Sequence, residues 1–285
     1  MKFIKGVKSL TKYDIYLIDQ WGVIHNGIKK FTKAYKVLLF LKKIGKKLII
    51  ISNSSENSLS TIKNTLNKLK IDKNLFYKIV TGGEIFEKEI KKIKLKFKKK
   101  KLKCYCISEF NKKEILLKQN IFIAKKNEKI DFILASSIKP NSNIKRLKNE
   151  LNYFLDKNIP MICTNPDKIV FSGKINKLVY QVGILAEYYK QNGGRVKFYG
   201  KPYPKIFQEC LTQEKKVSKK RVLMIGDSLQ NDILGGQNFN IDTLFILNGN
   251  HKNEFLKLED NEIKSIIKNK WKKINPTYIL DQLKL

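Results

Sequence analysis

A chain of 285 residues, 42% hydrophobic and 29% charged, has the size and composition of a soluble globular protein of one large or two ordinary domains. No apolar run approaches the length of a membrane-spanning helix, and the N-terminus lacks the apolar segment of a signal peptide. Four cysteines in a chain of this length do not indicate a disulfide framework. These features favour a cytoplasmic enzyme without a membrane partner.

The formal net charge of +34 raises the question of nucleic-acid binding, because lysines neutralise phosphates and release counterions. Of the 59 basic residues, however, only Arg146, Arg195 and Arg221 are arginine. Nucleic-acid readers usually favour arginine, which makes bidentate contacts with phosphate and guanine. An excess of lysine, asparagine and isoleucine is typical of a chain encoded by an AT-rich genome. We therefore expect no specific nucleic-acid partner.

Strand-like and helix-like segments alternate along most of the chain. The strand candidates span residues 16–18, 48–51, 102–107, 121–124, 131–135, 160–163, 196–199, 222–225 and 241–247. Between the first two, residues 34–44 carry apolar side chains at helical spacing, and Gly45 follows as a helix C-cap would. This alternation predicts an α/β fold with a mainly parallel sheet.

The middle of the chain has the pattern of a separate unit. Its helix candidates are rich in lysine, and a glycine pair stands on either side of it, at Gly82–Gly83 and at Gly193–Gly194. Glycine pairs supply flexible backbone at such seams. We therefore expect a doubly wound, Rossmann-like parallel-sheet core built from residues 1–86 and 193–285, with a second α/β domain, residues 87–192, inserted into it.

Polar clusters follow four of the strand candidates outside the insert. They are Asp19, the pair Ser52–Asn53, Lys201 between a glycine and a proline, and Asp227. In doubly wound sheets ligands bind beyond the carboxyl ends of the strands, where these clusters would meet. A carboxylate can attack phosphorus and form an aspartyl-phosphate, which divides one difficult displacement into two easier ones.

Such chemistry brings two anions together, so the site needs positive charge. Mg²⁺ takes oxygen ligands, which Asp19 and Asp227 can supply, and Lys201 can neutralise the remaining charge. The Ser52 hydroxyl and nearby backbone N–H groups can hold the phosphoryl oxygens. Since the chain has two histidines, a histidine-based zinc site is not expected. The residues thus predict a magnesium-dependent phosphoryl-transfer site.

The order of these clusters resembles the four-motif signature of the haloacid dehalogenase (HAD) superfamily: Asp19, Ser52, Lys201 and then the segment Gly226–Asp232. The inserted domain lies between the second and third motifs, which resembles the class with a large α/β cap. The segments Thr164–Asp167 and Tyr199–Pro202 resemble, more narrowly, the NagD-like subgroup, class IIA. The resemblance spans nearly the whole chain and implies a HAD core with an inserted cap.

The resemblance also implies a role for each matching position. Asp19 would be the nucleophile and a magnesium ligand, together with the backbone carbonyl of Trp21 and the carboxylate of Asp227. Lys201 would stabilise the nucleophile and the intermediate, and Asp232 would support the metal shell or Lys201. Binding of phosphate or substrate would fall to Ser52, Asn53, Lys201 and, in the cap, Asn165, with Asp167 beside it toward the cleft.

Trp21 departs from the pattern of the resembling phosphatases. They usually carry a second aspartate two residues after the nucleophile, which protonates the leaving group and then activates water. A tryptophan cannot transfer protons, and general acid–base help is typically worth ~10²–10⁴-fold in rate. His25 is close enough in sequence to substitute, or it can serve as a packing residue of the loop.

The sequence therefore predicts a magnesium-dependent HAD-type hydrolase, a phosphatase of small phosphorylated metabolites such as sugar phosphates or nucleotide-like compounds. Because of Trp21, one alternative is a weakened HAD-fold protein that binds phosphorylated ligands without efficient turnover. A second alternative, nucleic-acid binding through lysines, predicts tight and steeply salt-dependent association with duplex DNA. The substrate itself and the formation of a homo-oligomer are left open.

Overall fold

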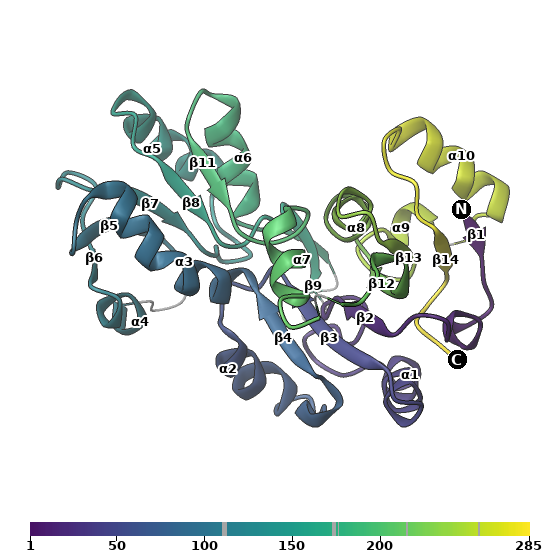
Figure 1. The fold of residues 1–285 in the computed structure, drawn as a ribbon. Coiled ribbons are helices and arrows are strands. Elements are labelled where there is room, and N and C mark those ends of the chain that lie inside the picture. The colour runs from purple at the N-terminus through teal and green to yellow at the C-terminus, as the bar shows by residue number, and fades with distance from the viewer. Residues whose placement is uncertain (110–112, 173–174, 176, 215, 256) are drawn as a thin grey trace.

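Two parallel β-sheets, of seven and of five strands, organise the computed structural model of the protein (Figure 1). The structure describes residues 1–109, 113–172, 175, 177–214, 216–255 and 257–285. In Figure 1 the five-stranded sheet lies on the left, and both ends of the chain lie on the right beside the seven-stranded sheet. The expected α/β class is confirmed by this architecture.

The seven-stranded sheet draws its strands from both ends of the chain, and all its neighbouring strands are parallel. In spatial order they are β1 (Lys2–Phe3), β14 (Tyr278–Leu280), β13 (Asp242–Ile246), β12 (Val222–Gly226), β2 (Ile15–Ile18), β3 (Lys47–Ser52) and β4 (Lys78–Thr81). The register places Ile18 between Ile225 on β12 and Ile50 on β3. The carboxyl ends of β12, β2 and β3 therefore lie side by side.

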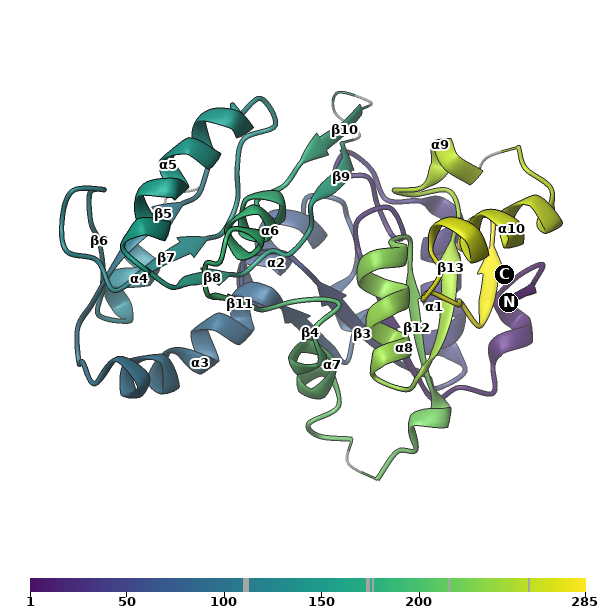
Figure 2. The same ribbon diagram turned by 90° about the horizontal axis from the view of Figure 1, so that it is seen from above.

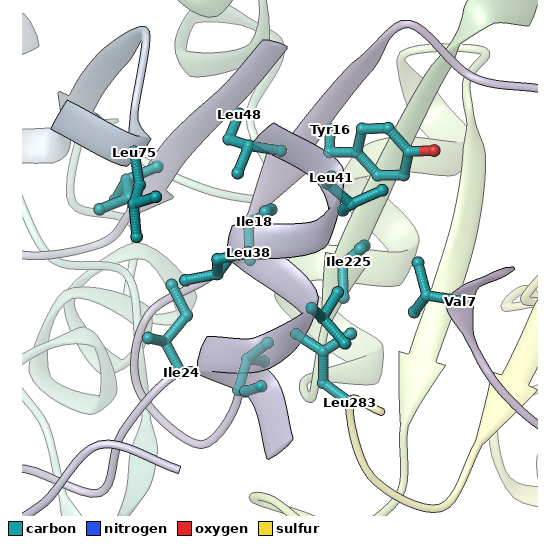
Figure 3. Close-up of a cluster of buried hydrophobic side chains, with 14 of the residues drawn as sticks. Val7, Tyr16, Ile18, Ile24, Leu38, Leu41, Leu48, Leu75, Ile225 and Leu283 are labelled. Carbon is teal, nitrogen blue, oxygen red and sulfur yellow. The ribbon is translucent and has the colours of Figure 1, made fainter. Parts of the chain in front are cut away.

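Both faces of this sheet are covered, so its central strands are apolar throughout. On one face, α1 (Thr32–Lys43) buries Leu38 and Leu41 against alternate strand residues such as Leu48 and Ile225 (Figure 3). The other face packs against α7 (Pro204–Cys210), α8 (Leu234–Asn238) and α10 (Asp260–Lys270). Near-continuous runs of isoleucine, leucine and valine are typical of parallel strands buried on both faces.

The helices change face between β2 and β12, which makes this point the topological switch of the sheet. The elements that connect β2, β3 and β4 pack on the α1 face, and those that connect β12, β13 and β14 pack on the opposite face. A crevice opens at the carboxyl edge where connections diverge in this way, and ligands of doubly wound folds bind there. Asp19 and Asp227 follow directly after these two strands.

The five-stranded sheet comes from the middle of the chain and is also parallel. Its spatial order is β11 (Val196–Phe198), β8 (Met161–Cys163), β7 (Phe132–Ala135), β5 (Leu102–Ile107) and β6 (Ile121–Ile123). Helices α5 (Ile144–Asp156) and α6 (Gly183–Gln191) cover one face, while α3 (Gly82–Phe97) and α4 (Lys113–Lys118) cover the other.

An antiparallel hairpin, β9 (Ile169–Ser172) and β10 (Lys177–Tyr180), was not predicted from the sequence. Figure 2 shows it between the two sheets. The remaining short helical segments are η1 (Val7–Leu10), α2 (Ser58–Thr61), η2 (Ile62–Leu66), η3 (Lys73–Leu75), η4 (Lys219–Arg221), η5 (Leu229–Ile233) and α9 (Lys252–Phe255).

The seams between the sheets differ from the sequence expectation in two respects. Of residues 196–199, expected to belong to the core, the first three form β11, which pairs with β8 because α6 packs across β7 and β8 and returns the chain to that edge. Gly82 and Gly83 do not form a loose linker but open α3, where an added Cβ would lie 2.2 Å from Thr164 O and 2.3 Å from Ser55 O, respectively. The domain limits at residues 86, 87, 192 and 193 stay a prediction.

None of the helices in the described part of the chain combines the length and the apolar character needed to cross a membrane.

The neighbours Leu38 and Leu39 on α1 allow a test of this packing. Leu38 is fully buried and Leu39 is 45% exposed. We expect Leu38→Ala to lower the free energy of unfolding by about 2–5 kcal/mol, because it leaves a cavity against the sheet. Leu39→Ala should change it by less than ~1 kcal/mol. Urea unfolding of both variants measures the difference, and equal losses would contradict this assignment of the core.

Candidate active site

The sequence-predicted clusters meet in one small cavity at the carboxyl edge of the seven-stranded sheet. Its volume is about 40 Å³, and its lining includes Asp19, Trp21, Ser52, Asn53, Lys201 and Asp232. Asp19 follows β2, and Ser52 ends β3, so the parallel register brings them together directly. Lys201 arrives by another route, since it follows β11 of the five-stranded sheet.

Lys201 is the centre of the polar cluster. Its side chain is 2% exposed, and its Nζ lies 2.7 Å from Asp19 Oδ1 and 2.7 Å from Asp232 Oδ1. Nζ also donates a hydrogen bond to Ile51 O at 3.1 Å. Burial alone would lower the pKa of Lys201, but the Asp19 and Asp232 carboxylates raise it overall. The lysine therefore stays charged between two acids.

The backbone of Lys201 is clasped by the side chain of Asn53. Asn53 Oδ1 accepts a hydrogen bond from Lys201 N at 2.6 Å, and Asn53 Nδ2 donates to Lys201 O at 3.1 Å. Gly200 allows this approach, because it has a φ of +131° and an added Cβ would lie 2.6 Å from Asn53 Oδ1. The side chain of Asn53 thus positions Lys201, and its predicted contact with phosphate stays a prediction.

Asp227 is fully buried and lies between two glycines from distant parts of the chain. An added Cβ would lie 1.9 Å from Asp227 Oδ2 at Gly22 and 2.1 Å from the same atom at Gly249. The backbone N–H of Asn250 donates to Asp227 Oδ2 at 2.8 Å. Burial, followed by the charges of Asp19 and Asp232, raises the pKa of Asp227 well above its usual range.

A cation fits this arrangement of carboxylates. Oxygen atoms of Asp19, Asp227 and Asp232 all lie within 4.8 Å of one another. Lys201 pairs with the first and third, whereas no described lysine or arginine pairs with Asp227. Burial also raises the pKa of Asp19, to about 7, although Lys201 opposes the shift. A hard divalent cation that takes oxygen ligands would relieve this crowding of negative charge.

Asp167 enters the same cavity from the segment between β8 and β9. Its Oδ1 accepts hydrogen bonds from Asn53 Nδ2 at 2.8 Å and from Asn231 Nδ2 at 2.6 Å. Asn165 Oδ1 accepts a hydrogen bond from Asp167 N at 3.0 Å, which fixes the turn that presents Asp167. Asn165 does not itself line the cavity, so its predicted contact with substrate stays a prediction.

Trp21 forms a wall of the cavity and is held in place from the other side. An added Cβ on Gly27 would lie 2.2 Å from the indole, and the ring meets His25 edge to face with centroids 5.5 Å apart. His25 is 2% exposed, and burial lowers its pKa to about 4. It does not line the cavity, so the structure favours the packing role for His25 over proton transfer.

Several lining residues were not included in the predicted site. Asn231 lies inside the segment Gly226–Asp232, and Asn250 follows the predicted strand at residues 241–247. Both could have been found from the sequence, because polar residues that follow a predicted strand are candidates for the site. Ser228 also lines the cavity. Val170 gave no signal, because it reaches the cavity from the unpredicted β9–β10 hairpin.

Comparisons with known proteins agree with this geometry. Two family models described as haloacid dehalogenase-like hydrolase match residues 16–121 and 109–240, and one described as HAD-hydrolase-like matches residues 198–284. A 4-nitrophenylphosphatase of Schizosaccharomyces pombe is 24% identical over 266 residues, which are 86% of this chain and 87% of the relative.

Solved structures share the whole architecture. A haloacid dehalogenase-like hydrolase from Brucella suis has a TM-score of 0.82 at 24% identity, with 99% of this chain and 100% of that chain covered. A possible sugar phosphatase of the HAD superfamily from Cytophaga hutchinsonii has a TM-score of 0.76 at 22% identity, with 99% and 98% covered. The chain belongs to the haloacid dehalogenase-like hydrolases and has the fold of their NagD-like class.

Proposed function

We propose that the protein is a magnesium-dependent phosphatase of small phosphorylated metabolites that works through an aspartyl-phosphate on Asp19. The observation that carries the proposal is the ion-paired cluster in which Lys201 bridges Asp19 and Asp232 beside the buried Asp227. The names of the 4-nitrophenylphosphatase relative and the possible sugar phosphatase support a phosphate ester as substrate.

In this proposal each residue has a chemical task. Asp19 attacks phosphorus, while Lys201 holds the attacking carboxylate and offsets its charge. Ser52 binds a phosphoryl oxygen. Asp19, the Trp21 carbonyl and Asp227 would hold Mg²⁺, which supplies charge neutralisation to the phosphoryl group when bound. Asp232 keeps Lys201 in place, since it forms an ion pair with the same ammonium at 2.7 Å.

We propose that substrate enters before the two sheets close on it, because the cavity is small. A volume of about 40 Å³ has room for a few water molecules, far less than the ~300–1,000 Å³ of ordinary small-molecule pockets. Val170 on β9 and Asp167 between β8 and β9 also line the cavity, and both come from the middle of the chain. We propose that the unit of the five-stranded sheet acts as a cap that opens for substrate and then excludes water.

The comparisons give no support to the alternative of binding without turnover, because the relatives with assigned chemistry are named as phosphatases. A specific nucleic-acid partner is not part of the proposal. The cytoplasmic location and a homo-oligomeric state stay predictions.

The nucleophile assignment predicts a large loss in Asp19→Asn. We expect turnover of 4-nitrophenyl phosphate with Mg²⁺ to fall on the order of 10⁴-fold, because an amide cannot form the phosphoryl ester. The control is Asp260→Asn, which makes the same change at an exposed position on α10. Equal activity of the wild type and the Asp19 variant would sink the assignment.

A carboxylate introduced at position 21 separates the proposed phosphatase from the weakened alternative. If the wild type is efficient, Trp21→Asp should raise kcat by less than about tenfold, whereas the alternative predicts a gain of ~10²–10⁴-fold. Trp21→Asn is the matched control, since it removes the indole without adding an acid. We expect the two variants to differ little, and a gain specific to the aspartate would favour the alternative.

The metal site predicts opposite effects of Asp227→Asn with and without magnesium. The folded-state pKa of Asp227 is raised above its usual 3.8, so ionising it costs stability in the fold. Without metal, the wild type should lose stability relative to the variant as the pH rises from about 4 through the raised pKa. Mg²⁺ should reverse this order, because it binds the folded wild type better.

Urea unfolding between about pH 4 and about pH 8, with and without Mg²⁺, measures both effects. Asp281→Asn is the control, because Asp281 pairs with Lys284 at the surface, away from the metal site. Mg²⁺ should stabilise this variant as much as it stabilises the wild type. Equal stabilisation of wild type and Asp227→Asn by Mg²⁺ would refute Asp227 as a ligand.

A further inference from the structure

The cavity holds one acid that the cluster around Lys201 does not use. The titratable groups among its described lining residues are Asp19, Asp167, Lys201 and Asp232. The ammonium of Lys201 forms ion pairs with Asp19 and Asp232 and donates a hydrogen bond to the carbonyl of Ile51. Asp167 makes no ion pair with any described residue, and it is the remaining acid of the cavity.

Asp167 is held through one of its two carboxylate oxygens. Both amide donors, Asn53 Nδ2 and Asn231 Nδ2, bind its Oδ1. Oδ2 accepts no hydrogen bond from a described residue, and it is not one of the enclosed polar atoms that lack a partner. Asp167 lines the cavity together with Asp19.

We propose that Asp167 is the catalytic acid–base residue of this enzyme. It would carry out the proton transfers that the indole of Trp21 cannot perform. This inference rests on the proposed phosphatase function. Its geometric basis is that Asp167 shares the cavity with Asp19 and is fixed by two amides through one oxygen, while the other oxygen accepts no hydrogen bond from a described residue. It reaches the cavity from the segment between β8 and β9, outside the seven-stranded sheet.

The proton transfers balance over two steps. In the first, Asp19 Oδ bonds to phosphorus, the bond from phosphorus to the leaving oxygen breaks, and the Asp167 carboxyl proton passes to that oxygen. In the second, a water oxygen bonds to phosphorus and the bond from phosphorus to Asp19 breaks. The water proton passes to the Asp167 carboxylate, which restores the acid and releases phosphate.

The surroundings of Asp167 suit this cycle. Burial raises its pKa, and the charge of Asp232 adds to that rise, while Lys201 and the amide of Asn53 oppose it. The charge of Asp167 in turn contributes to the raised pKa of Asp19, which lines the same cavity. A carboxyl group with a raised pKa keeps its proton closer to neutral pH, which a general acid requires.

The test compares Asp167→Asn with the wild type on a series of ring-substituted phenyl phosphates. These esters are similar in size but differ in how much their leaving phenol needs a proton. We expect the variant to lose less than about tenfold on 4-nitrophenyl phosphate and ~10²–10⁴-fold on the esters with the most basic phenols. A loss that grows along the series supports proton transfer by Asp167, and an equal loss on every ester would overturn it.

Asp167→Ala separates proton transfer from positioning, because it also removes the acceptor of both amides. If Asp167→Asn behaves as the wild type and only Asp167→Ala is impaired, the residue merely positions the loop and the proposal falls. Asp156→Asn, an exposed change at the end of α5, is the control. Thermal melting shows that each variant is folded.

The wild-type data distinguish failure of the proposed phosphatase function from failure of the role proposed for Asp167. A wild type that hydrolyses none of the esters with Mg²⁺ would overturn the phosphatase function, and this inference with it. A wild type that is active and loses activity in Asp19→Asn upholds the function, and the series then judges Asp167 alone.

Discussion

The buried ammonium of Lys201 is the interaction on which the rest of the site depends. It lies 2.7 Å from two carboxylates, and two further carboxyl groups, Asp227 and Asp167, lie in the same polar cluster. Removing one partner of a buried ion pair typically costs about 3–5 kcal/mol, since the other charge is left uncompensated. One described cation thus lies among four acids, and this imbalance of charge favours the binding of a metal ion.

The charges lie together because the strands that carry them end at the topological switch point of the sheet. Parallel strands buried on both faces deliver Asp19 and Asp227 to neighbouring positions at one edge. Side chains on the adjoining loops would block that approach, and the glycines at positions 22 and 249 remove them. The apolar layers of the sheet therefore fix the spacing of the acids, while the glycines set how closely the loops surround them.

Most of the core could be predicted from the sequence because its signals are local. Continuous apolar runs ending in Asp19, Ser52 and Asp227 identify strands and their exits without any knowledge of their neighbours. Membership of a sheet is not local, so β11 looked like a core strand until its pairing with β8 was known. The part played by Asp167 is equally non-local, since it depends on amides 114 and 64 residues away along the chain.

A tryptophan at position 21, together with a proposed acid at Asp167, bears on how the turnover of the enzyme would be controlled. An acid two residues after Asp19 would belong to the core and would be present whether the proposed cap is open or shut. Asp167 reaches the core loops through hydrogen bonds to Asn53 and Asn231, so separating the two units would withdraw it. In the proposed mechanism an open form would keep Asp19 and Lys201 in place but would lack its acid. Closure on a fitting substrate would then complete the reactive site, which couples specificity to turnover.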